Sequence, residues 1–65
     1  MKLIDCHTQK ELFNNAWIER YGKKYEVLNI DFINKTAKIR EAGALIAWPQ
    51  ERSDLENYFK LIFVE

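Results

Sequence analysis

The feature that most constrains this chain is a two-residue alternation of apolar and polar side chains, clearest in residues 29–40, NIDFINKTAKIR. Side chains on a β-strand point alternately to the two faces of a sheet, so this period predicts strands. A two-residue turn at Asn34-Lys35 sets the register, because Asn tolerates the positive φ of hairpin turns. One face is then apolar and the other carries polar or oppositely charged pairs. The predicted pairs are Phe32 with Ala37, Ile30 with Ile39, Asp31 with Lys38 and Asn29 with Arg40.

The same period extends over the chain from about residue 17 to its end. YGKKYEV has the composition of a turn, which predicts strands over residues 17–21 and 25–32. The apolar run ALIAW, residues 44–48, predicts a further strand that ends at Pro49. In the C-terminal stretch two mostly apolar sets alternate: Phe59, Leu61 and Phe63 against Tyr58, Lys60, Ile62 and Val64. A strand that is apolar on both faces is expected in the centre of a small barrel or under a partner.

Helix signals are confined to two places. Residues 8–11, TQKE, fit a capping box, while Asn14-Asn15 favours an early end, so we predict a short helix over residues 9–15. The alternative is one helix over residues 9–21. A second capping box at residues 53–56, SDLE, leaves room for a single helical turn.

These elements predict one mainly β domain over residues 1–65. We expect a small antiparallel meander, or an SH3-like or OB-like barrel of four to five strands, with one short N-terminal helix, because closure protects sheet edges. The alternative is an α+β fold with helix 9–21 packed on a three- to four-stranded antiparallel sheet. A single cysteine excludes an internal disulfide, and no Cys/His cluster is present for zinc, so stability must come from packing or a partner chain. In size and strand-rich texture the chain resembles small β-rich proteins of phages and mobile elements.

Charge and motifs exclude several function classes. Ten Lys/Arg balance ten Asp/Glu, which weakens the case for a nucleic-acid or membrane partner. No apolar run approaches the roughly 18 residues of a membrane span, and the N-terminus lacks a signal-peptide stretch. Cys6 and His7 would point to opposite faces of an extended strand, and no phosphate-binding glycine loop is present. We therefore expect a complete, cytoplasmic, non-enzymatic protein with no metal, cofactor or small-molecule substrate.

Aromatic residues point to a protein-interaction function. Two Trp, three Tyr and four Phe exceed what the interior of a 65-residue domain holds, and Trp and Tyr dominate interface hot spots. We expect a module that binds another protein or itself, such as an accessory or inhibitor protein of a phage or mobile element. The predicted protein-binding residues are Trp17, Trp48, Tyr58, Ile62 and Val64.

A single-stranded nucleic-acid binder is the alternative. Residues 20–40 hold six basic and two acidic side chains, and a basic sheet face with exposed rings is how OB-like barrels bind single strands. The neutral total charge places this alternative second. Its predicted contacts are Arg20, Tyr21, Lys23, Lys24, Tyr25, Lys38 and Arg40.

Overall fold

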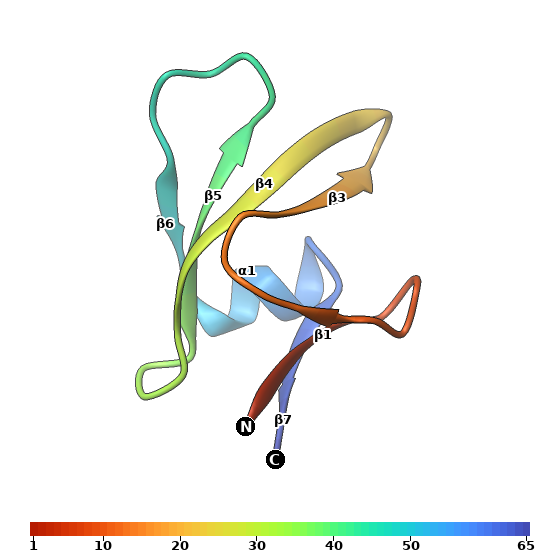
Figure 1. Cartoon of the computed structure of the whole chain (residues 1–65), viewed down its shortest axis with the longest axis vertical. Coiled ribbons are helices and arrows are strands. Elements are labelled where there is room, and N and C mark those ends of the chain that lie inside the picture. Colours follow the sequence, from red (N-terminus) through yellow and green to blue (C-terminus); the bar gives the residue numbers. More distant parts are fainter.

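Two antiparallel sheets and one short helix make up the structure, a computed structural model that describes all residues 1–65 (Figure 1). The elements in chain order are β1 (Lys2–Asp5), β2 (Glu11–Leu12), β3 (Ala16–Arg20), β4 (Lys23–Asp31), β5 (Thr36–Glu41), β6 (Trp48–Gln50), α1 (Arg52–Asn57) and β7 (Leu61–Val64). One sheet has the order β2-β1-β7 and the other β3-β4-β5-β6, so the two terminal strands lie side by side. The expected mainly β fold with a small helix is confirmed, but the two sheets keep separate ladders and no closed barrel forms. No helix has the length and apolar character needed to cross a membrane.

The core lies between the two sheets and is completed by α1. Both sheets and the segment from α1 to β7 contribute to one cluster of buried apolar side chains, because alternate residues of each strand face inward. In β7 the predicted alternation holds, with Leu61 and Phe63 buried while Ile62 and Val64 are half-buried. The members of the cluster are Leu3, Leu12, Ile18, Tyr25, Val27, Ala37, Ile39, Leu55, Phe59, Leu61 and Phe63.

The predicted hairpin forms, but with a longer loop and a different register. Asp31 lies opposite Thr36, so residues 32–35 form a four-residue loop in place of the expected two-residue turn. The Asp31 carboxylate closes this loop by accepting hydrogen bonds from the Ile33 and Asn34 amides at 2.9 and 3.0 Å. An aspartate that bonds the backbone two and three residues ahead favours such a turn, and this preference overrides the one at Asn34.

A β-bulge then returns the apolar side chains to the core. The register shifts between Leu28 and Asp31, where Asn29 adopts a left-handed backbone with φ 48°. The observed pair is Val27 with Ile39, not Ile30 with Ile39, and Ile30 still packs partly against the core because the bulge reverses the alternation. Phe32, expected on the hairpin strand opposite Ala37, lies in the loop and packs edge-on against the core ring of Phe63.

The N-terminal helix is absent, in both its short and its long version. Residues 9–15 form turns and β2, and Gln9 and Asn15 have φ values of 63° and 72°, which a right-handed helix does not admit. The Gln9 amide instead donates to the Asp5 carbonyl at 2.7 Å, within the turn between β1 and β2. The helix that does form is α1, at the second capping box, although its N-cap Glu51 makes no side-chain capping bond.

The predicted strand over residues 44–48 is also wrong. Residues 42–47 form the loop between β5 and β6, and β6 begins where the strand was expected to end. Pro49 lies within β6, which it can do because β6 is an edge strand and needs hydrogen bonds on one side only. The apolar run that suggested a buried strand is therefore left in solvent.

Candidate interaction surface

Two rows of side chains cross the outer face of the four-stranded sheet. Strand register places Trp17, Glu26 and Arg40 opposite one another, on the side away from the buried neighbours Ile18 and Ile39. The adjacent row is formed by Glu19, Lys24 and Ala42, with the Ala42 amide bonded to the Lys24 carbonyl at 2.8 Å.

Arg40 holds the first row together. Its Nε and Nη2 donate to Glu26 Oε1 at 3.2 and 2.5 Å, and its Nη1 donates to the Ala44 carbonyl at 2.9 Å. Its guanidinium carbon lies 5.7 Å from the centroid of the Trp17 ring, within cation–π range. The indole is half-exposed yet fixed from one side, so it offers a rigid aromatic surface to solvent.

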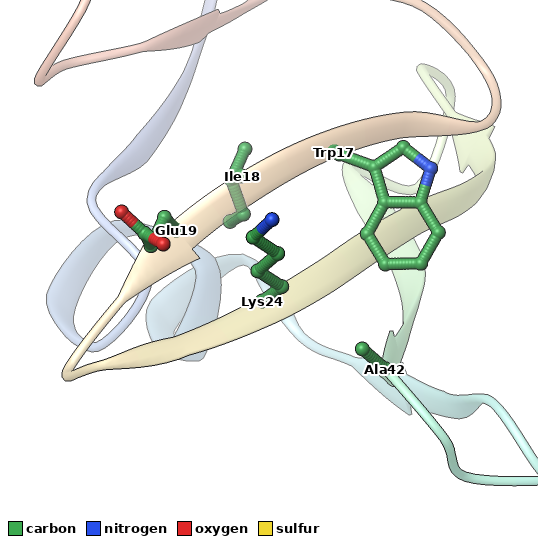
Figure 2. A pocket seen from close by; sticks show the side chains of 5 residues that line it. All are labelled: Trp17, Ile18, Glu19, Lys24 and Ala42. Atoms are coloured by element: carbon green, nitrogen blue, oxygen red, sulfur yellow. The ribbon is translucent and has the colours of Figure 1, made fainter.

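A shallow open groove lies beside this network. Figure 2 shows the Trp17 indole and the Lys24 side chain rising from β3 and β4, with Ala42 beyond them. Glu19 and Lys24 are cross-strand partners and both are exposed, but no ion pair joins them. The groove is thus lined by the Trp17 ring, the Glu19 carboxylate and the Lys24 ammonium group, and neither charged group has an ion-pair partner.

The loop over residues 42–47 begins at the groove, with Ala42, and carries exposed apolar side chains. Gly43 turns the chain with φ 91°, a conformation that favours glycine. Leu45 is 98% exposed, and Ile46 and Trp48 are each about two-thirds exposed at 60% and 64%. Isolated exposed apolar residues are common, whereas several in one loop make this segment a candidate interaction surface. We call the groove together with this loop the Trp17 surface, made of Trp17, Glu19, Lys24, Ala42, Leu45 and Ile46.

The predicted protein-binding residues do not share one surface. Trp17 lies on the outer face of β3, whereas Trp48 lies opposite the buried Ile39 and so faces the other side, with two strands between them. Tyr58 follows α1, where its ring packs on that of Tyr21 at 4.8 Å between centroids and its carbonyl accepts the Tyr21 hydroxyl. The remaining two, Ile62 and Val64, line the outer face of the three-stranded sheet.

Arg20, a predicted nucleic-acid contact, is buried. Its Nη2 forms an ion pair with Asp5, its Nε donates to the Phe59 carbonyl at 2.9 Å and its Nη1 donates to the Glu19 carbonyl at 2.8 Å. Burial on its own would raise the pKa of Asp5, but the His7 amide and the Arg20 guanidinium outweigh it and lower the pKa. Arg20 therefore links the two sheets and is removed from the predicted surface.

Tyr25 is removed from that surface as well. It is a core residue whose ring meets Phe59 edge-on at 5.3 Å, and burial raises the pKa of its hydroxyl. Of the other basic residues, Arg40 is neutralised by Glu26 and Lys23 pairs with Glu41 at 3.5 Å. Of the predicted nucleic-acid contacts, Tyr21, Lys24 and Lys38 remain exposed, and neither lysine has an acidic partner.

The exposure of Leu45 and Ile46 differs from the sequence prediction, because an apolar run bounded by proline has the pattern of a buried strand. The available signal was Gly43 among small residues, which favours a loop. No protein family, curated protein or solved structure matches this chain. Its function must therefore be inferred from the chemistry of the surface.

Proposed function

We propose that this protein is a non-enzymatic interaction module that binds a protein through the Trp17 surface. The observation that carries the proposal is the pair Leu45 and Ile46, exposed at 98% and 60% in the loop that Arg40 ties, through the Ala44 carbonyl, to the half-exposed Trp17 ring. Burying large apolar side chains of this kind contributes about 1.5–3 kcal/mol each, so their exposure in the isolated chain is a source of binding free energy.

The groove is also suited to binding because it is already ordered. Arg40 fixes the Trp17 indole through the cation–π contact and fixes the loop through its bond to the Ala44 carbonyl. A partner would then find its aromatic anchor in place and would not have to order it, which lowers the entropic cost of association.

The wider role belongs to the same proposal. An accessory or inhibitor protein of a phage or mobile element would act by occupying a partner's surface, and a 65-residue chain without a recognisable catalytic motif suits that task. Cytoplasmic residence is proposed on the single unpaired thiol, Cys6, which a reducing compartment preserves.

Site-specific photocrosslinking tests the proposal. A photoreactive residue placed at Leu45 should crosslink to a protein, either a cellular partner or a second copy, and Trp17→Ala should abolish the crosslink. The same probe at Lys10, which is exposed in the turn between β1 and β2, is the matched control. Equal crosslinking from both positions, or none from Leu45, would contradict the proposal.

Single-stranded nucleic acid is the second candidate, favoured by the exposed ring of Tyr21 and by Lys24 and Lys38, which have no acidic partner. Binding of this kind must weaken with added salt as counterions are released. A random oligonucleotide that binds in low salt and is released by Lys24→Glu together with Lys38→Glu would support it. Unchanged oligonucleotide mobility at every protein concentration would exclude it.

A further inference from the structure

We propose that the partner of the Trp17 surface is a second copy of this chain, arranged as a twofold-symmetric dimer. The inference rests on the proposed function and adds the identity of the partner. It starts from Glu19 and Lys24, which lie opposite each other on β3 and β4 at the groove, exposed and without an ion pair.

An acid and a base side by side form a self-complementary pair under twofold rotation. In a symmetric interface the same patch is used by both subunits, and the contact of residue i with j is repeated as j with i. An axis that runs along the strands between β3 and β4, in the plane of the interface, places Glu19 of one copy over Lys24 of the other. Both charges then gain a partner in two symmetric pairs, and a net charge of zero for the chain adds no overall repulsion.

The apolar part of the surface fits the same arrangement. Rotation about this axis brings the two Trp17 indoles, one row away from Glu19, close to each other. The loop of residues 42–47 leaves the sheet on the side of β5 and is carried past β3 of the other copy, an edge strand whose outer side has no neighbour. The loops that carry Leu45 and Ile46 would thus extend the contact beyond the Glu19 and Lys24 row.

Interface area favours a whole second copy over a single inserted side chain as the occupant of the Trp17 surface. A stable interface buries about 800 Å² per partner, roughly a fifth of the 4416 Å² that this chain exposes. The open groove has five lining residues, so it needs the adjoining loop to approach this area. A second copy engages groove and loop together.

Charge exchange tests the pairing directly. Sedimentation of the wild-type protein should show a mass that rises with concentration from 7.8 kDa towards twice that value. Glu19→Lys and Lys24→Glu should each weaken self-association by about tenfold or more, because each places like charges together. An equimolar mixture of the two variants should recover the dimer as a heterodimer, since every lysine at these two positions of one subunit then faces a glutamate of the other.

The controls match the charge changes at positions outside the surface. Glu11→Lys and Lys10→Glu alter exposed residues near β2 and should leave the dimer unchanged. A wild-type protein that stays at 7.8 kDa at millimolar concentration would overturn the inference, as would variants whose mixture fails to associate. A monomer that still crosslinks from Leu45 to another protein would overturn the dimer while leaving the proposed function in place.

Discussion

Among the polar side chains of this fold, Arg20 should be the one whose replacement lowers the free energy of unfolding most. Arg20 and Asp5 are 4% and 3% exposed, and the guanidinium also satisfies the carbonyls of Phe59 and Glu19. These contacts join β1, β3 and the segment after α1, so one side chain connects both sheets. In Arg20→Met the methionine fills much of the volume but leaves the carboxylate and two carbonyls without their donor.

The expected loss is large compared with the total stability. Breaking a buried ion pair by removing one partner costs about 3–5 kcal/mol. A chain of this length is expected to have about 3–10 kcal/mol in total, from roughly 0.05–0.15 kcal/mol per residue. Arg20→Met should therefore lose between about a third and all of this stability. Asp5→Asn keeps an acceptor of the same shape, and we expect a loss of about 1–3 kcal/mol.

Urea denaturation followed by tryptophan fluorescence measures these losses, because the midpoint and slope give the free energy of unfolding. The double variant Asp5→Leu with Arg20→Met should be more stable than Arg20→Met alone, since no buried charge remains unpaired. Arg52→Met is the matched control: it removes an exposed pair with Glu56 at 2.8 Å and should cost about 0.5 kcal/mol or less. An Arg20→Met protein as stable as Arg52→Met would refute the reasoning, and so would a double variant no more stable than Arg20→Met.

Three further predictions concern titration and the hairpin loop. Burial alone would raise the pKa of Asp5, but the His7 amide and the Arg20 guanidinium outweigh it, so the folded pKa is below 3.8. The stability that this carboxylate contributes is full above pH 3.8 and is lost as the pH falls through the folded pKa. Acid unfolding of Asp5→Asn should lack this component. Burial raises the pKa of Tyr25 above 10.0. The neutral hydroxyl therefore adds stability below pH 10.0, and this stability is lost as the pH rises through the folded pKa. Thermal melts of Tyr25→Phe should lack this alkaline dependence. Because the Asp31 carboxylate accepts backbone amides of its own loop, Asp31→Ala should lower Tm measured by circular dichroism, whereas Glu65→Ala at the exposed C-terminus should not.

Strand content could be predicted from the sequence because it depends on local alternation. The inward set of β7 and the burial of Ala37 and Ile39 follow from a period of two alone. Register could not be predicted in the same way, because it was decided by one carboxylate in the loop and one bulged residue, Asn29. A single left-handed residue reverses the alternation of everything before it, so a correct strand can still have incorrect partners.

The N-terminal segment shows how a local signal can be overridden. Residues 8–11 fit a capping box, but the chain turns back through Gln9 so that β2 pairs with the side of β1 that β7 leaves free. Intrinsic helix preference amounts to a few tenths of a kcal/mol per residue. Burial of Leu3 and Leu12 in the core contributes more than that, at about 1.5–3 kcal/mol for each fully buried side chain.

The number of rings in the chain predicts surface exposure but does not locate it. Trp17, Trp48, Tyr21 and Tyr58 are all about half-exposed or more, as expected for a domain with so small an interior. Their positions depend on which strands are edges, and β3 and β6, which carry the two tryptophans, are the edges of the four-stranded sheet. An edge strand has a core on one face at most and a free backbone along one side, so a large ring there is exposed by geometry. A partner that covers the β3 edge would bury Trp17 and also satisfy that backbone, which is why the two features are expected to serve one contact.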